Sequence, residues 1–230
     1  MDDIIGFAKI AIDVPHFDET QSLLANNWQP HYNKVAYQGG WDVLPLRSPG
    51  GTDSIIADLM GNAEYADTPL MQSFPLINTL TKSLQCPLMS VRLLNLKTGA
   101  VIKQHKDYDL CFEKGEARLH FPIVTNNHVE FYVNDMKVNM LPGECWYINA
   151  NLPHRAANFG NTDRIHLVVD CIVNDWLKVV FDKSEKTTFK QLMDIEQTKM
   201  MITALRSHNS PTSDKLANDL ELKLSDHING

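Results

Sequence analysis

The sequence predicts a mainly β protein with helices on both sides of a strand-rich centre. Between residues 88 and 173, six short runs rich in β-branched and aromatic residues alternate with turn signals, at the spacing of a sandwich or a barrel. The segments before and after this centre carry apolar residues at helical spacing. Together these observations predict a closed β core with helices available to cover its apolar faces.

The size and composition are those of an ordinary globular chain. The 230 residues are 43% hydrophobic and 8% aromatic, which suffices for one domain with a full core. No apolar run reaches the roughly 20 residues that a membrane-spanning helix requires. Residues 1–3 lack the basic and apolar regions of a secretory signal. We therefore expect a cytoplasmic protein that binds no membrane.

Charge and cysteine content exclude two further classes. The formal net charge of -7 argues against nucleic acid as a partner, because proteins that bind its phosphates usually carry a basic patch. The four cysteines are widely spaced and form no CxxC pair, which fits neither a zinc ribbon nor a dense disulfide framework. We expect these four to be free thiols: Cys86, Cys111, Cys145 and Cys171.

The elements follow one another in three zones. In the first, to about residue 86, apolar spacing favours helices over 17–26 and 70–84, and glycines mark loops at 39–40 and 48–51. In the last, from about residue 183, two apolar repeats predict helices on either side of a loop at 207–211. The strands expected between them cover 88–96, 101–104, 118–124, 129–133, 145–149 and 164–173.

This organisation predicts one domain over residues 1–180 and a helical extension over 181–230. The extension could cover the sheet or form a dimer interface. The oligomeric state stays open.

Several polar residues share strand faces. Arg118 lies on one face with His120, and Arg164 shares a face with His166 and Asp170, because alternate side chains point the same way. One interpretation is that these faces are the solvated side of antiparallel strands. The other is that helices cover the opposite, apolar faces, and the polar faces line the mouth of a small barrel. The sequence leaves both interpretations open.

His105 and Asp107 have the spacing at which two side chains of one strand can reach one metal ion. With the distal His154 they would supply three ligands and leave half of an octahedral iron(II) site open. A His-x-Asp pair alone is weak evidence for a metal site, and a loop histidine beside a proline is usually a surface residue. Arg164, ten positions after His154, could hold an anionic cosubstrate.

Five motifs follow in a fixed order over about residues 88–172. Each combines polar residues of the predicted site with the turn or strand that carries them. They are His105-Lys106-Asp107, Arg118-Leu119-His120-Phe121, Pro142-Gly143-Glu144-Cys145-Trp146, His154-Arg155-Ala156-Ala157-Asn158 and Arg164-Ile165-His166-Leu167-Val168-Val169-Asp170.

In this order the motifs resemble the aspartyl/asparaginyl beta-hydroxylase family. The whole chain, including residues 37–51 and the helical tail, resembles more closely the bacterial free L-proline hydroxylases within that family. The resemblance implies a double-stranded β-helix core, which is a jelly roll of the cupin type. It also implies a 2-oxoglutarate-dependent iron(II) dioxygenase, with Fe(2+), 2-oxoglutarate and O2 taking part in the reaction.

The resemblance also implies roles for single residues. His105, Asp107 and His154 would be the catalytic iron ligands, and Arg164 would pair with the distal carboxylate of 2-oxoglutarate. A guanidinium group suits that partner because it can bind a carboxylate through two hydrogen bonds.

Arg118 and His120 match a motif that lies near the iron-bound end of the cosubstrate and the substrate carboxylate. His128 and His166 receive no role, because the sequence gives them no partner. Four further residues are candidate substrate contacts, each with an ordinary structural role as the alternative: Arg47, Arg92, Trp41 and Asn158.

The leading hypothesis is a hydroxylase that acts on a free, proline-like amino acid or a similar small carboxylate and releases succinate and CO2. One alternative is a peptidyl aspartyl/asparaginyl beta-hydroxylase with the same chemistry. Another is a cupin-like binding module without catalysis, whose histidines only decorate a solvated strand face.

Overall fold

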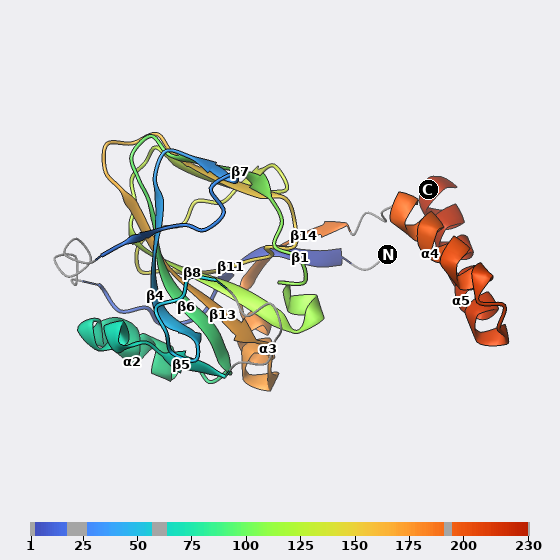
Figure 1. Cartoon of the computed structure of the whole chain (residues 1–230), viewed down its shortest axis with the longest axis horizontal. Helices are drawn as coiled ribbons and strands as arrows, with labels where there is room; N and C mark the ends of the chain where they lie inside the picture. The colour runs from blue at the N-terminus through green and yellow to red at the C-terminus, as the bar shows by residue number, and fades with distance from the viewer. Residues whose placement is uncertain (1–2, 18–26, 57–63, 191–194, 230) are drawn as a thin grey trace. The chain divides into compact units, whose positions relative to one another are not determined.

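Figure 1 shows a computed structural model of the chain, which describes residues 3–17, 27–56, 64–190 and 195–229. The chain divides into two compact units, one of Ile5–Thr188 and one that takes in Met1–Ile4 and Phe189–Gly230. Most of the helix expected over 17–26 lies outside the described residues. The first unit contains all the predicted site residues.

Two antiparallel sheets form the first unit, one above the other in Figure 1. The strands of the smaller sheet are β3 (Tyr37–Gln38), β7 (Val101–His105), β9 (Val129–Val133), β10 (Met136–Lys137) and β12 (His154–Asn158). The strands of the larger sheet are β1 (Asp3–Ile10), β2 (Gln29–Pro30), β4 (Trp41–Pro49), β5 (Tyr65–Asp67), β6 (Leu88–Leu96), β8 (Glu116–Val124), β11 (Cys145–Ile148), β13 (Arg164–Ile172) and β14 (Glu185–Lys190).

The order of the strands identifies the architecture. In the larger sheet it is β14-β1-β11-β8-β13-β6-β4-β2, with β5 beside β4, and in the smaller sheet β10-β9-β12-β7-β3. From β6 to β13 the chain passes from one sheet to the other at every step except that from β9 to β10, so that β6-β13-β8-β11 face β7-β12-β9-β10. This winding is the double-stranded β-helix, or jelly roll. The prediction of a mainly β fold with a jelly-roll core is confirmed.

Long-range pairing forms strands that local sequence does not reveal. His154, expected in a loop, is the first residue of β12, which pairs with β7 on one side and β9 on the other. The two alanines of β12, Ala156 and Ala157, have low strand propensity, so its neighbours determine its conformation. The strands β1 and β4 were likewise not expected from the sequence.

Helices cover the outer face of the larger sheet. The 3-10 turn η1 (Pro69–Ser73) leads into α2 (Pro75–Ser83), and α3 (Asp175–Asp182) follows β13; both helices lie beneath the sheet in Figure 1. Alternate residues of β8 and β13, such as Leu119 and Leu167, join the helices in one buried apolar cluster. The helix predicted over 70–84 is confirmed, and so is the interpretation that helices cover the apolar faces.

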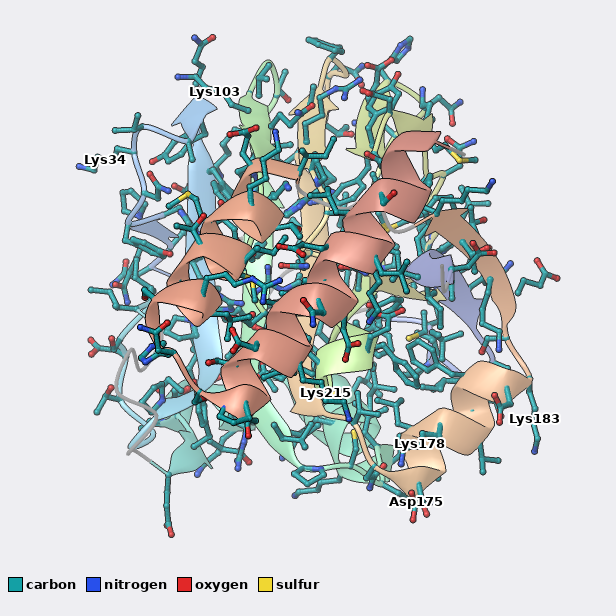
Figure 2. The ribbon with its side chains drawn as sticks, turned by 90° about the vertical axis from the view of Figure 1, so that its right-hand side faces the viewer. Lys34, Lys103, Asp175, Lys178, Lys183 and Lys215 are labelled. Atoms are coloured by element: carbon teal, nitrogen blue, oxygen red, sulfur yellow. The ribbon has the colours of Figure 1, made fainter. Side chains whose placement is uncertain are left out.

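The helix α3 was missed, because the sequence analysis placed the helical zone only from about residue 183. Its start is capped by Asn174, whose side chain accepts a hydrogen bond of 3.0 Å from the backbone N–H of Leu177. Asp175 and Lys178 form an exposed pair on its first turn (Figure 2), which adds little stability. A strand, β14, follows instead of the expected helix.

The second unit contains α4 (Ile195–Ser207) and α5 (Pro211–Asn229), which confirms the two predicted helices and the loop between them. Ser210 and Ser213 close the start of α5 through reciprocal backbone-to-hydroxyl hydrogen bonds of 3.1 Å. Arg206 near the end of α4 pairs with Asp214 and Glu221 of α5. Among the described helices, none is both long and apolar enough to span a membrane.

Candidate metal centre and its cavity

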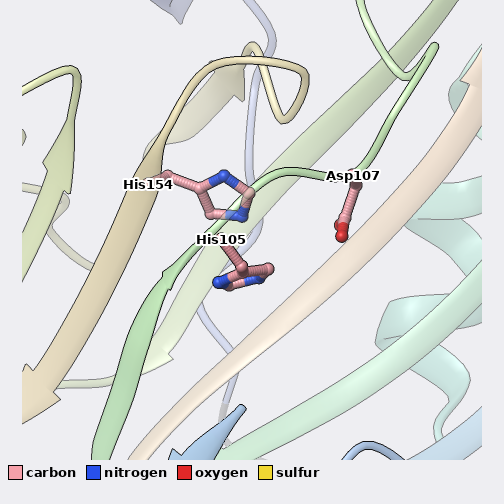
Figure 3. Close-up of side chains that lie close together, drawn as sticks. All are labelled: His105, Asp107 and His154. Atoms are coloured by element: carbon pink, nitrogen blue, oxygen red, sulfur yellow. The ribbon is translucent and has the colours of Figure 1, made fainter.

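Three candidate metal ligands meet where the smaller sheet ends its pairing. His105 is the last residue of β7 and lies directly opposite His154, the first residue of β12, with their ring centroids 4.1 Å apart. Asp107 follows two residues after His105 and turns toward both rings (Figure 3). One ligand atom of each residue lies within 4.8 Å of the others, which is compatible with a shared metal ion.

The backbone orients both imidazoles toward this common point. The Nδ1 atom of His105 is 2.8 Å from the carbonyl oxygen of Lys103, and that of His154 is 3.0 Å from the carbonyl oxygen of Leu152. A carbonyl oxygen only accepts, so each Nδ1 carries the hydrogen and each Nε2 keeps its lone pair for a metal. Burial, with the charge of His105, lowers the pKa of His154 to about 4 and keeps it neutral at pH 7.

The carboxylate of Asp107 is held ionised beside the histidines. Arg118 donates a hydrogen bond from Nη1 to Oδ2 of Asp107. Burial alone would raise the pKa of Asp107, but its interactions with its neighbours, above all with the charge of Arg118, outweigh burial and lower the pKa. Two imidazole nitrogens and one carboxylate suit a divalent first-row metal such as iron(II) and leave further coordination positions free. The residues present therefore fit the metal that the sequence analysis expected.

The metal centre lies in a cavity of about 540 Å³. Both sheets contribute to its lining, and the polar residues of β8 and β13 face into it. The polar face of β13 is buried, and on β8 His120 is buried and Arg118 half-buried, so these faces are not the freely solvated side of the sheet. This finding decides between the two interpretations left open by the sequence.

Arg164 is a buried cation without an acidic partner among the described residues. It is 2% exposed, and its Nη2 donates a hydrogen bond of 2.9 Å to Nδ1 of His166. The guanidinium lies 5.7 Å from the ring centroid of Phe131, and its Nε has no hydrogen-bond partner. Burial lowers the pKa of Arg164 to about 9, so it stays charged at pH 7. A buried, unpaired charge is unfavourable, so an anion bound beside Arg164 in the cavity would stabilise it.

His166, to which the sequence analysis gave no role, is the partner that orients Arg164. Its ring meets that of His120 edge to face at 5.9 Å. Burial and the charge of Arg164 lower the pKa of both histidines, which keeps them neutral. His120 Nδ1 and His166 Nε2 are buried without partners. His166 lies two residues after Arg164 on the same strand face, and this spacing could have predicted their contact.

A second charged cluster lies further along β13 and includes the missed residue Asp170. Arg118 binds it through Nε and Nη2, at 2.7 and 3.0 Å, and Arg92 binds it through Nη2 at 2.7 Å. Ser90 donates a further hydrogen bond of 2.8 Å. Burial opposes the ionisation of Asp170, but the two arginines lower its pKa far below the usual range. The structure thus places both predicted arginines in the cavity, with their charges partly compensated.

Arg47 lines the cavity, but most of its donors are occupied. It pairs with Asp67 at 2.9 Å and donates to the backbone carbonyls of Tyr65 and Leu88 at 2.5 and 3.2 Å. These bonds connect β4 to β5 and to the start of β6. The position fits a role in shaping the wall at least as well as direct contact with a substrate.

Trp41 lines the cavity as part of an aromatic stack. Its ring lies 3.6 Å from that of His31, nearly parallel, and Tyr32 stacks on the other side of His31 at 4.7 Å. Burial and the charge of Arg92 lower the pKa of His31 to about 4, so the ring is neutral. His31 could not be predicted from sequence spacing, because its stacking partner lies ten residues away on another element.

Asn158 is the one predicted site residue that the structure does not bring to the cavity. It is buried at the end of β12, where its Nδ2 donates to the carbonyl oxygens of Leu96 and Thr162 at 3.0 and 2.8 Å. Its Oδ1 accepts from the backbone N–H of Gly160 at 3.1 Å. These bonds stabilise the turn between β12 and β13.

Comparison with known proteins shows the family of the chain. The sequence profile described as Aspartyl/Asparaginyl beta-hydroxylase matches residues 16–173, more than half of the chain. The L-proline cis-4-hydroxylase of Rhizobium meliloti (strain 1021) is 33% identical over 134 residues, which are 57% of this chain and 48% of that protein. The L-proline cis-3-hydroxylase 2 of a Streptomyces species is 29% identical over 138 residues, 57% of this chain and 47% of that protein.

The chain thus spans about half the length of the curated relatives it matches. Among solved structures, the viral collagen prolyl hydroxylase of Paramecium Bursaria Chlorella virus-1 is 12% identical, with a TM-score of 0.42 over 73% of this chain and 97% of that one. A likeness so distant carries no argument. The family match does, and it confirms the resemblance seen in the motifs: the chain belongs to the aspartyl/asparaginyl beta-hydroxylase family.

Proposed function

We propose that this protein is an Fe(II)- and 2-oxoglutarate-dependent dioxygenase that hydroxylates an unactivated C–H bond of a free, proline-like amino acid or a similar small carboxylate. One observation carries the proposal: the unpaired, buried Arg164 shares a cavity with the His105, Asp107 and His154 cluster. Such a cavity offers a metal at one end of a short dicarboxylate and a guanidinium at the other.

Phe131 supports this placement of the cosubstrate. Its ring lies between the two ends, with its centroid 6.3 Å from that of His154 and 5.7 Å from the guanidinium carbon of Arg164. A short diacid lying along this ring would reach both. Arg164 would bind the distal carboxylate through two hydrogen bonds, and its contact with His166 holds the guanidinium plane in position.

Bound iron(II) would supply the activation of O2, coupled to the conversion of 2-oxoglutarate into succinate and CO2. The protein residues bind, orient and exclude water. Lys103 and Leu152 hold the ligand histidines through their carbonyl groups, and Arg118 holds Asp107. Arg92, together with Arg118, presents positive charge to the carboxylate of a substrate.

The named relatives support the substrate class. Both curated relatives are named as hydroxylases of L-proline, a free amino acid. The family name gives only weak support to the runner-up, a peptidyl aspartyl/asparaginyl hydroxylase with the same chemistry. A module without catalysis is disfavoured, because it would have no use for a buried, unpaired arginine beside three potential metal ligands.

A turnover screen tests the proposal. The protein, supplied with Fe(II), 2-oxoglutarate and O2, is offered the free amino acids and short peptides, and products are measured by a mass gain of one oxygen. Succinate should form in step with a hydroxylated product, and His105→Ala and His154→Ala should each abolish both. His128→Ala, an exposed histidine outside the cavity, is the matched control. Unchanged turnover in both ligand variants would exclude the assigned site.

A further inference from the structure

One carboxylate in the cavity has no basic partner. Glu116 is the first residue of β8 and lines the cavity on the same face as Arg118 and His120, because alternate side chains of a strand point the same way. Within the described residues its side chain forms no ion pair or hydrogen bond. The other acids near it, Asp170 and Asp109, each form an ion pair, with Arg118 and Lys114 respectively.

Glu116 also lies close to a second negative charge. In the pairing of β8 with β13, Arg118 is opposite Asp170, and Glu116 is opposite Ile172. Glu116 and Asp170 are therefore diagonal neighbours, at a spacing where long side chains interact. Burial raises the pKa of Glu116, the charges of Asp170 and Asp109 raise it further, and the charge of Arg118 opposes these effects only in part. A positive charge placed beside Glu116 would relieve this repulsion.

Two arginines lie beside Asp170. Arg92 on β6 and Arg118 on β8 flank the central strand β13, and both bind Asp170. The Nε atom of Arg92 is buried without a partner. The cavity thus offers unmet hydrogen-bond donors for an anion and, a short distance away, an unmet acceptor for a cation.

We propose that Glu116 binds the protonated α-amino group of the substrate while Arg92 and Arg118 bind its carboxylate. The site then selects a free amino acid as a zwitterion. An aspartyl or asparaginyl residue inside a peptide has an uncharged amide nitrogen at this position, so the half-buried Glu116 would gain no ionic partner from it. The inference rests on the proposed function and deepens it by naming the substrate class that the same cavity admits.

The test compares each free amino acid with its N-acetyl derivative. Turnover is measured first, and calorimetry without O2 then measures binding to the protein loaded with Fe(II) and 2-oxoglutarate. The wild type should turn over at least one free amino acid and prefer it at least tenfold over the acetylated form. Glu116→Gln should bind that amino acid about 10- to 100-fold more weakly, the loss expected for one hydrogen bond to a charged group. Its affinity for 2-oxoglutarate should not change.

Two variants separate binding from folding. Glu116→Gln is isosteric and removes a charge beside Asp170, so its melting temperature should equal or exceed that of the wild type. Glu116→Asp keeps the charge on a shorter side chain and should retain the preference for the free amino acid with weaker binding. Glu185→Gln, an exposed glutamate on β14, is the control and should bind as the wild type does.

The outcomes distinguish the two proposals. If the wild type hydroxylates a free amino acid and Glu116→Gln keeps its affinity and its preference, the ammonium site is wrong and the oxygenase assignment stands. Turnover of peptides or acetylated residues alone overturns the inference in the same way. Absence of succinate with every compound overturns the proposed function, and the inference fails with it.

Discussion

Replacing Arg164 by methionine should stabilise the ligand-free protein and at the same time remove most of its affinity for 2-oxoglutarate. Methionine has a comparable length and a flexible, apolar side chain, so it can fill the space beside Phe131 without a charge. The two effects have one cause. Burial of the guanidinium without an anion costs free energy of folding, and a bound anion offsets that cost.

The structure gives the size of the first effect. Burial lowers the pKa of Arg164 from 12.5 to about 9. At about 1.4 kcal/mol per pH unit, this difference destabilises the folded state by roughly 5 kcal/mol at pH 7, where the group is protonated in both states. The variant escapes this cost but loses the hydrogen bond to His166, worth about 1.5 to 3 kcal/mol. A net gain of about 2 to 3.5 kcal/mol remains, which corresponds to a melting temperature roughly 4 to 14 °C higher.

The second effect is the loss of a buried, hydrogen-bonded charge pair with the cosubstrate. Removing one partner of such a pair costs about 2 to 5 kcal/mol, so the affinity for 2-oxoglutarate should fall at least 30-fold or so. At a concentration about 100 times the dissociation constant, 2-oxoglutarate should stabilise the wild type by about 2.7 kcal/mol. The same concentration should hardly stabilise the variant.

Thermal unfolding with and without 2-oxoglutarate measures both effects in one experiment. Arg155→Met is the control, because Arg155 is only partly buried, pairs with Asp135 at 2.6 Å and stacks on Tyr132. It should not stabilise the ligand-free protein. A lower melting temperature for Arg164→Met, with an unchanged response to 2-oxoglutarate, would refute the argument that Arg164 is an unpaired charge kept for an anion.

Three further predictions concern the scaffold. Gly39→Ala should destabilise the protein by more than Gly99→Ala in urea unfolding: both positions have positive φ, +79° and +77°, but only at Gly39 would the new Cβ lie 2.9 Å from a backbone carbon. Leu119→Ala, in the centre of the core, should cost about 2 to 5 kcal/mol, whereas the exposed Leu222→Ala should stay within about 0.5 kcal/mol, by the same measurement. Burial opposes ionisation of Asp163, but the three hydrogen bonds that it accepts lower its pKa. Its contribution to the free energy of unfolding is therefore present above the unfolded pKa of about 3.9 and is lost as the pH falls. The stability of Asp163→Asn, followed by thermal unfolding from pH 6 to pH 2, should therefore depend less steeply on pH.

The sequence predicted the group of candidate metal ligands because two of the three lie close together along the chain. His105 and Asp107 are two residues apart on one strand, and this spacing alone places them on one face. His154 was predicted from the order of the motifs, but its strand was not. The residues of β12 have little strand propensity, and only pairing with β7 and β9, up to 57 residues away along the chain, makes the segment extended.

The partners of the site residues could not be predicted, because they depend on the order of the strands. Asp170 shares a face with Arg164 in the sequence, yet its bonds to Arg92 and Arg118 exist only because β13 lies between β6 and β8. His31 contacts Trp41 only through the fold of the loop before β4. Sequence spacing predicts which side chains share a face of one strand, whereas the strand order of the jelly roll determines which strands are neighbours.

The strand order also explains how one cavity could bind the carboxylates of the cosubstrate and of the substrate at two separate positions. Arg164 and Asp170 lie on the same face of β13 and are six residues apart, which is about 20 Å along an extended strand. The anion site proposed at Arg164 is therefore remote from the arginines that surround Asp170, and no single guanidinium would serve both. Because Arg118 bonds to Asp107 and Asp170 together, the substrate end is coupled to the metal ligands, whereas Arg164 reaches them only across Phe131. A cosubstrate that spans from Arg164 to the metal and a zwitterion held beside Asp170 would then meet only at the metal, where the reaction requires both.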